Sequence, residues 1–171
     1  VIATHFALHQ QFSPAAIVSL NGAFLPFGSA AAPVFNRLAQ WLSKSRLLAY
    51  ITAAHGMFNR PIRNMLVETG PSPSAQMLQC YRELISRPDH VTGTLKMMAG
   101  WDLADQRQVL PSLRTPLHLV VCTNDRTVSP WQSERLSEFV TCSKLYRVPD
   151  LGHLGHEEDP TPFADIIRAA L

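Results

Sequence analysis

Three short runs of hydrophobic residues punctuate this chain, and each is bounded by turn-forming residues. This pattern is typical of buried β-strands. The predicted strands are Ala15–Leu20, Leu117–Cys122 and Lys144–Val148. The Leu-His-Leu-Val-Val-Cys composition of the second run is typical of a parallel strand that is covered on both faces.

Helical periodicity is predicted beside these runs. We expect helices over Val1–His9 and Trp131–Val140, the second opened by Pro130 at its first position. A last helix starts near Thr161 and is predicted to present one apolar face, formed by Phe163, Ile166, Ile167 and Leu171. Strand, helix, strand and helix in this order predict an α/β fold, with a parallel sheet flanked by helices.

A helical insertion interrupts the strand pattern between about residues 23 and 100. Its predicted helices are Pro33–Ser43, Ser45–His55, Pro61–Glu68, Ser74–Ser86 and Val91–Ala99. The insertion contains eight Lys and Arg residues against three acidic ones and is rich in Phe, Met, Leu and Trp. We therefore expect residues 1–22 and 101–171 to form a core, and residues 23–100 to form a basic helical cap.

Composition narrows the class of protein. Hydrophobic residues at 46% and charged ones at 16% are typical of a globular chain. A net charge of +2 without a Lys/Arg run gives no support to nucleic-acid binding. No stretch reaches the roughly 18 apolar residues of a membrane span. Cys80, Cys122 and Cys142 form neither a disulfide framework nor a metal pair, which favours buried apolar roles in a reducing cytoplasm.

Asp125 and His153 carry the clearest chemical signal. Asp125 comes directly after the second predicted strand, and His153 lies in the loop after the third. Open parallel sheets place functional groups at the carboxyl ends of their strands. An aspartate there can accept a hydrogen bond from histidine Nδ1–H, which leaves Nε2 as a general base. Acid and then histidine is also the order of the last two members of a Ser…Asp…His triad.

Each of these residues has a simpler interpretation when taken alone. Asp125 can be a turn former, since Asn and Asp favour turns, and His153 can be a surface loop histidine. Their placement on consecutive strand ends favours the catalytic interpretation of the pair. His5 and His9 have the spacing of two metal ligands on a helix, but no third ligand accompanies them. No metal or other cofactor is therefore expected.

A nucleophile is missing from the pattern. The sequence has no G-x-S-x-G motif, and no Ser, Cys or Asp on a strand-to-helix elbow before the insertion. Without a nucleophile and oxyanion donors, these residues alone are not expected to catalyse acyl transfer. The chain opens without Met, on a helical pattern that has no N-cap. We therefore expect this chain to be a fragment, with the nucleophile a few residues before Val1.

Several segments resemble a known superfamily. Leu119–Pro130 resembles the acid-bearing strand and loop of α/β-hydrolases, and Pro149–Glu158 resembles their histidine loop. Together with Ser19–Phe27 and Met97–Leu103, they are similar to the magnesium-chelatase accessory hydrolases of bacteriochlorophyll biosynthesis in photosynthetic bacteria. The resemblance covers essentially the whole chain, but only the C-terminal portion of that family's chain.

This resemblance implies an α/β-hydrolase fold in which Asp125 is the triad acid and His153 is the triad base. It also implies a role near magnesium insertion into protoporphyrin, with magnesium chelatase as a partner. The two junctions of the insertion suggest where a substrate would bind, because Phe24, Leu25 and Trp101 flank them. Apolar residues there would suit a tetrapyrrole or another hydrophobic ligand, and the basic excess would suit a carboxylate or an anionic membrane surface. The same apolar residues could instead pack the insertion onto the core.

Three functions stay open at this stage. The first is a serine hydrolase that acts as an accessory factor in magnesium-porphyrin biosynthesis. The second is an esterase, lactonase or haloalkane-type hydrolase with a similar cap. The third is a non-catalytic protein that binds a tetrapyrrole or assists the chelatase. The residue at the nucleophile elbow would separate ester from halide chemistry, and substitutions at Asp125 and His153 would separate the enzymes from the binding protein.

Overall fold

A computed structural model of the protein describes the ranges 2–9, 14–25, 50–51, 59–69, 73–99 and 106–171, together with residues 54 and 103. The helix predicted over Pro33–Ser43 lies outside the described residues. So does the helix predicted over Ser45–His55, except at positions 50, 51 and 54, which are helical.

The chain forms two compact units. The first consists of Val1–Pro26, Glu68–Pro71 and Leu103–Leu171, and the second of Phe27–Val67 and Ser72–Asp102. The second unit falls within the range of the predicted insertion except at its edges. The four residues Glu68–Pro71 return to the first unit, where they have a part in the site described below.

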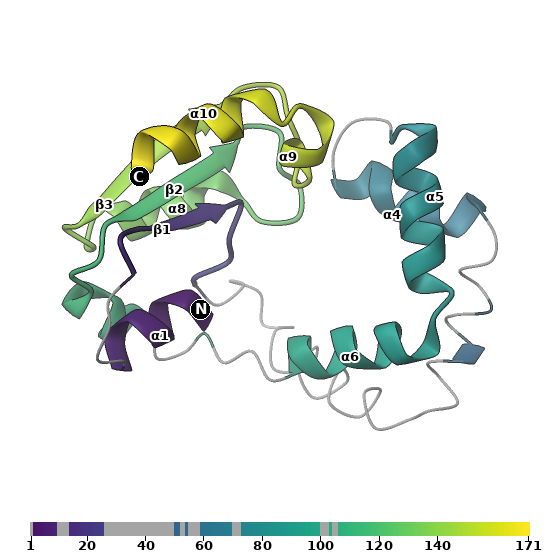
Figure 1. Ribbon diagram of the computed structural model, residues 1–171, viewed down its shortest axis with the longest axis horizontal. Helices are drawn as coiled ribbons and strands as arrows, with labels where there is room; N and C mark the ends of the chain where they lie inside the picture. Colours follow the sequence, from purple (N-terminus) through teal and green to yellow (C-terminus); the bar gives the residue numbers. More distant parts are fainter. Residues whose placement is uncertain are drawn as a thin grey trace. The chain divides into compact units, whose positions relative to one another are not determined.

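A parallel sheet in the order β1-β2-β3 forms the centre of the first unit (Figure 1). β1 is Ile17–Leu20, β2 is Leu117–Cys122 and β3 is Ser143–Val148. Both pairings are parallel. The predictions of an α/β class and of these three strands are therefore confirmed, because buried parallel strands are continuous apolar runs that end at turn formers.

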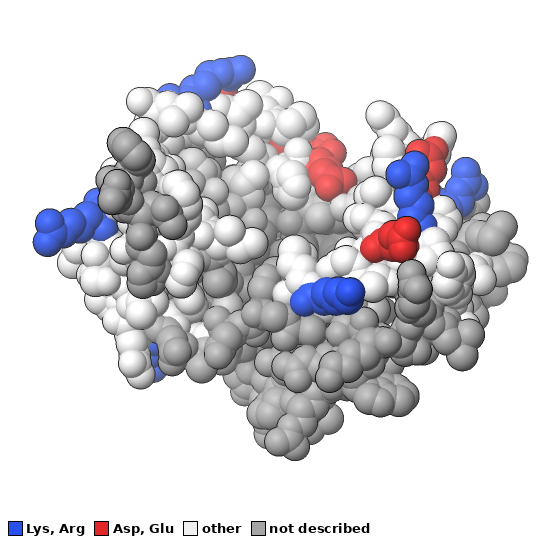
Figure 2. All heavy atoms as spheres, turned by 60° about the horizontal axis from the view of Figure 1, so that its bottom comes forward, with Lys and Arg blue, Asp and Glu red and all other residues white. Residues whose placement is uncertain are grey.

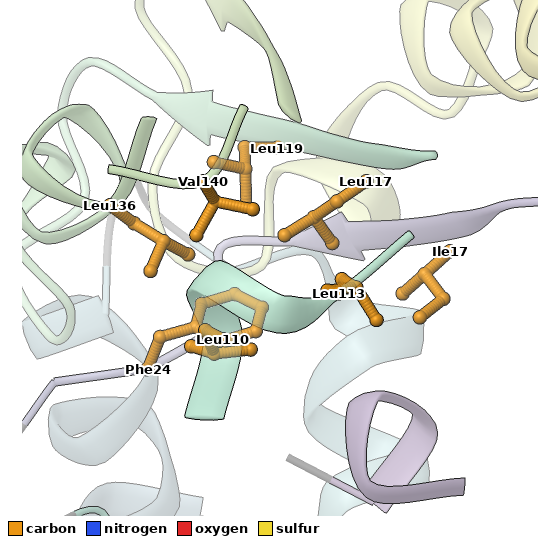
Figure 3. Close-up of a cluster of buried hydrophobic side chains, with 8 residues drawn as sticks. All are labelled: Ile17, Phe24, Leu110, Leu113, Leu117, Leu119, Leu136 and Val140. Carbon is orange, nitrogen blue, oxygen red and sulfur yellow. The ribbon is translucent and has the colours of Figure 1, made fainter. Parts of the chain in front are cut away.

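One face of this sheet is covered by three helical segments. They are α1 (Ile2–His9), α7 (Gln106–Val109) with the 3₁₀ helix η1 (Leu110–Ser112), and α8 (Pro130–Ser137). The buried side chains of this core come from β1, β2, η1, α8 and the adjoining loops, and Ala7 and Leu8 of α1 are partly buried against them. Figure 3 shows the buried side chains converging under the sheet: Ile17, Phe24, Leu110, Leu113, Leu117, Leu119, Leu136 and Val140. In β2 this face uses alternate residues, as the pleat of a strand requires.

The other face of the sheet carries α10 (Thr161–Ala170), which lies on the opposite side from α1 (Figure 1). Phe163 is 2% exposed and packs on Val120, Cys122 and Val148, with Ile166 partly buried beside it. The predicted apolar face of this helix is wrong in its second half, since Ile167 is 37% and Leu171 is 87% exposed. The stripe that packs on the sheet follows Phe163 and Ile166 instead.

Two further predictions are corrected in detail. α8 ends at Ser137 and not at Val140, because the chain turns after Leu136 and buries Val140 in the core below the sheet. Cys80 is exposed, whereas Cys122 is fully buried as predicted; all three cysteines are free thiols.

The regular secondary structure described in the second unit is helical. α4 is Asn59–Thr69, whose last two residues belong to the first unit; α5 is Ala75–Ile85 and α6 is Pro88–Ala99. The side chain of Ser74 caps α5 by accepting a hydrogen bond from the backbone N–H of Met77. Among the described residues, no helix is long and apolar enough to cross a membrane.

Candidate active site

Asp125 lies just beyond β2, in a turn closed by its own backbone N–H and the carbonyl of Cys122 (3.2 Å). Its side chain is 1% exposed. Oxygen Oδ1 accepts hydrogen bonds from the backbone N–H groups of Thr127 and Val128, both at 2.8 Å. These backbone bonds orient the carboxylate without help from another side chain, and they leave Oδ2 able to accept a hydrogen bond from one.

His153 lies in the loop after β3, and its ring reaches that second oxygen. The distance from Nδ1 to Asp125 Oδ2 is 2.8 Å. Because a carboxylate only accepts hydrogen bonds, Nδ1 is the donor in this contact, and Nε2 is the ring nitrogen left to act as a general base. The side chain of His153 is 26% exposed, and Nε2 has no hydrogen-bond partner among the described residues. The two residues predicted from strand ends are therefore adjacent, in the geometry of an oriented general base.

The backbone of the histidine loop is held at several points. Asp150 adopts a left-handed φ of 63°, and its N–H donates to Thr123 Oγ1 at 3.0 Å. The carbonyl of Leu151 accepts from the N–H of Asn124 at 3.0 Å. The N–H of His153 itself donates to the carbonyl of Thr69 at 2.6 Å. Thr69 belongs to the first unit although it ends α4, so this short returning segment contributes directly to the site.

A one-turn helix, α9 (Gly155–Glu158), follows the loop. Glu158 Oε1 accepts a hydrogen bond from the N–H of Gly152 at 3.3 Å. Burial raises the pKa of Glu158, against the opposing effects of the Gly152 hydrogen bond and of His156. The side chain thus supports the loop through the backbone N–H of Gly152.

Asn21 is the site residue that sequence reasoning missed. It follows β1 and is 4% exposed. Its Nδ2 donates to the carbonyl oxygens of Gly152 (3.2 Å) and His153 (2.8 Å), and its Oδ1 accepts from the N–H of Cys122 (2.8 Å). The sequence marks Asn21-Gly22 only as a strand end. The available signal was its position, because β1 ends at the same edge of the sheet as the strands that precede Asp125 and His153.

Cys122 also lies in this cluster, but its chemistry is that of a packing residue. Its thiol sulfur lies 3.2 Å from Asn21 Nδ2 and is fully buried. Burial raises the pKa of the Cys122 thiol, and the nearby carboxylates of Asp125 and Glu158 raise it further. A thiol kept protonated in this way is a poor nucleophile.

The remaining candidate residues fall elsewhere. Phe24 is 3% exposed within the hydrophobic core of the first unit, and Leu25 is 8% exposed, its N–H donating to Gln132 Oε1 at 3.3 Å. Their contact with a ligand stays a prediction, and Trp101 lies outside the described residues. No group of three potential metal ligands occurs in the part of the chain that the structure describes.

Comparisons with known proteins identify the family of the chain. Residues 1–166 match the Alpha/beta hydrolase family. The chain is 33% identical over 141 residues to the magnesium-chelatase 30 kDa subunit of Rhodobacter capsulatus, a match that covers 82% of this chain and 49% of that protein. This chain therefore spans about half the length of its curated relative.

Solved structures share the fold at low sequence identity. An enol-lactonase from Burkholderia xenovorans matches with a TM-score of 0.69 and 16% identity, over 98% of this chain and 60% of that one. An esterase from Thermogutta terrifontis matches with a TM-score of 0.65 and 21% identity, over 98% and 59% respectively.

Proposed function

Since this chain belongs to the alpha/beta hydrolase family, we propose that Asp125 and His153 are the acid and the base of a hydrolytic triad. The observation that carries the proposal is the 2.8 Å contact between His153 Nδ1 and the buried Asp125 carboxylate. The carboxylate fixes the tautomer of the ring and stabilises the imidazolium that forms during the reaction. Nε2 is then placed to accept a proton.

The proposed reaction is hydrolysis of an acyl bond. His153 Nε2 removes the proton of a serine hydroxyl while the serine oxygen attacks the carbonyl carbon of the substrate. The imidazolium then gives that proton to the leaving group, and a water molecule hydrolyses the acyl-serine by the same steps. The serine precedes Asp125 in the chain order of this family. The 171 residues contain no G-x-S-x-G motif.

The first experiment measures hydrolysis of a panel of p-nitrophenyl esters by the full-length protein. We expect Asp125→Asn to lower kcat by about 10⁴-fold, because the amide favours the wrong histidine tautomer. We expect His153→Ala to lower it by at least as much. Asp165→Asn and His90→Ala are matched surface controls, since both side chains are exposed, and they should keep full activity. Unchanged turnover in both site variants would refute the triad.

A pathway role is the finer part of the proposal. We place the protein as an accessory factor in magnesium-porphyrin and bacteriochlorophyll biosynthesis. Its support is the 33% identity to the magnesium-chelatase 30 kDa subunit. The substrate would then be a hydrophobic small molecule or a tetrapyrrole, and magnesium chelatase would be a partner.

Complementation separates a catalytic from a non-catalytic form of this role. A strain that lacks the gene is supplied with wild-type protein, with Asp125→Asn or with His153→Ala, and its magnesium-porphyrin content is measured. Loss of pigment in both variants, at normal protein levels, supports an enzyme in the pathway. Normal pigment would favour a protein that binds a tetrapyrrole or assists the chelatase without catalysis.

Membrane contact through the basic insertion stays a weaker proposal. The described basic residues of the second unit include Arg63, Arg87 and Lys96, all exposed. On the face drawn in Figure 2, however, the described Lys and Arg side chains are interspersed with uncharged and acidic ones. Co-sedimentation with vesicles of anionic lipid, at low and high salt, would test whether the positive charges bind a membrane surface.

A further inference from the structure

We propose that Asn21 is a positioning residue that sets the orientation of His153 by holding the backbone of its loop. The inference rests on the proposed function for its catalytic consequence, but its structural part stands on contacts alone. Asn21 is 101 positions from Cys122 and 132 positions from His153 along the chain. It is therefore the side chain that joins β1, the end of β2 and the histidine loop.

Both polar atoms of the Asn21 side-chain amide form hydrogen bonds. Nδ2 lies 3.2 Å from the carbonyl oxygen of Gly152 and 2.8 Å from that of His153, and these two carbonyls flank the histidine α-carbon. Oδ1 lies 2.8 Å from the N–H of Cys122. Holding the carbonyl groups on both sides of one α-carbon restricts the ψ angles of Gly152 and His153, and with them the direction in which the imidazole leaves the backbone.

The backbone conformation at position 21 also favours asparagine. Its φ is 50°, in the left-handed region that Asn tolerates better than most residues. Its own N–H donates to the carbonyl of Val120 at 2.9 Å, which ties the turn to β2. A side chain that supplies a donor and an acceptor, at a left-handed position 4% exposed to solvent, leaves few alternatives to asparagine.

These contacts complete the support of the histidine. Asp125 holds the ring at Nδ1, Thr69 accepts from the His153 N–H, and Glu158 accepts from the Gly152 N–H. Asn21 holds the carbonyl group of His153 and shares that of Gly152 with the N–H of Gly155, which donates to it at 3.1 Å. Without Asn21, the Gly152 carbonyl keeps the Gly155 donor, but the His153 carbonyl loses its side-chain donor and gains by rotating toward water.

Two variants test the assignment in the full-length protein. Asn21→Gly removes the amide and keeps the left-handed backbone accessible. Asn21→Asp keeps the shape and the acceptor for Cys122 but places a carboxylate oxygen against the two carbonyl groups. Gln132→Ala is the matched control, because Gln132 is also a buried amide (6% exposed) that binds a backbone group, at Leu25 and away from the histidine loop.

NMR of the His153 imidazole is the first measurement and does not need activity. In the wild type we expect the downfield Nδ1 proton that is hydrogen-bonded to Asp125. In Asn21→Gly and Asn21→Asp we expect this signal to broaden or disappear, while Gln132→Ala keeps it even if its melting temperature falls. A sharp, unshifted Nδ1 signal in either folded Asn21 variant would overturn the assignment.

Ester hydrolysis is the second measurement. We expect both Asn21 variants to lower kcat at least about tenfold with little change in KM, since a displacement of about 1 Å can cost about 100-fold in rate. Wild-type kcat in both variants would overturn the positioning role. Absence of hydrolysis in the wild type would instead count against the proposed function, and the NMR signal alone would then decide the role of Asn21.

Discussion

Asp125 is both a turn former and the partner of His153, so the two interpretations of this residue do not exclude each other. Its Oδ1 closes the turn through two backbone N–H groups, and its Oδ2 binds the histidine ring. The hydrogen bonds of the turn therefore set the direction in which Oδ2 points. Because the two backbone N–H groups already fix the carboxylate, it loses little conformational entropy when it forms the hydrogen bond to the histidine ring.

The acid and the histidine could be predicted from the sequence, whereas Asn21 could not. Asp125 and His153 each lie in the short loop after an apolar run, and the rule on strand ends applies to residues in such positions. Asn21 also follows a strand, but Asn-Gly is so frequent in turns that the dipeptide signals nothing beyond a strand end. Its role depends on hydrogen bonds to residues more than 100 positions away, which no local pattern encodes.

Glu158 makes stability depend on pH in a defined direction. Its pKa is raised on folding, so its favourable contribution is fully present below the ordinary pKa of glutamate and is lost as pH rises through the raised value. Glu158→Gln cannot ionise and keeps an oxygen that accepts from Gly152. We expect the free energy of unfolding of the wild type to fall relative to that of the variant over this pH range. Denaturant titrations at successive pH values measure the difference, and a difference independent of pH would contradict the expectation.

Substitution by alanine is expected to change the stability of the fold in opposite directions at Gly155 and Gly93. A Cβ at Gly155 would lie 2.6 Å from Cys122 Sγ and 2.9 Å from Leu151 Cβ, so Gly155→Ala should cost about 1–3 kcal/mol of stability. A Cβ at the exposed Gly93 meets nothing within 4 Å, so Gly93→Ala in α6 should stabilise by about 0.5–1 kcal/mol. Chemical denaturation compares the two variants. Equal effects would show that the close packing behind the histidine loop is not as described.

At the scale of elements, the sequence predicts strands better than helix faces. β2 was predicted with both its ends, because its mostly apolar run, which includes His118, is bounded by Pro116 on one side and by Thr123 on the other. α10 was placed correctly but its buried face was not. Phe163 and Ile167 lie one helical turn apart, and hydrophobicity alone does not show that the sheet below contacts only the first. The identity of the neighbouring element makes that selection.

The exposure difference within α10 gives a test at this scale. Phe163 is 2% exposed and packs on Val120 and Cys122, so Phe163→Ala should cost about 3–5 kcal/mol. Ile167 is 37% exposed, so Ile167→Ala should stay within about 1 kcal/mol of the wild type. Urea unfolding of both variants checks the order. A larger loss for Ile167→Ala would mean that this side of α10 is covered in solution.

At the scale of the whole molecule, the edge of the sheet formed by β1 has a consequence for association. In the described part of the chain, β1 pairs with β2 and with no other strand. The N–H groups of Ile17 and Asn21 point to the β2 side, so by alternation those of Val18 and Leu20 point away from it. An apolar strand with such an edge is a template for another strand.

We expect the 171-residue chain by itself to self-associate through this edge. Sedimentation velocity should show an average mass that rises with protein concentration. Val18→Pro removes one of the N–H groups that point away from β2, and an edge strand tolerates proline at such a position. We expect this variant to shift the chain toward monomer. A monomeric wild-type chain that unfolds cooperatively would contradict the expectation.

Asp125 and His153 follow the two strands of a single β–α–β unit, β2–α8–β3, whose strands are paired in register over six positions. The acid–base pair therefore comes from one contiguous part of the chain, whereas Asn21 and Thr69, which hold the histidine loop, come from outside it. Exchanging Phe27–Val67 and Ser72–Asp102 for the insertion of another family member should change specificity and spare the pair, provided that Glu68–Pro71 is retained. This segment has to stay because the Thr69 carbonyl accepts the hydrogen bond from the His153 N–H. The ends of Glu68–Pro71 are therefore the boundaries at which the insertion can be exchanged.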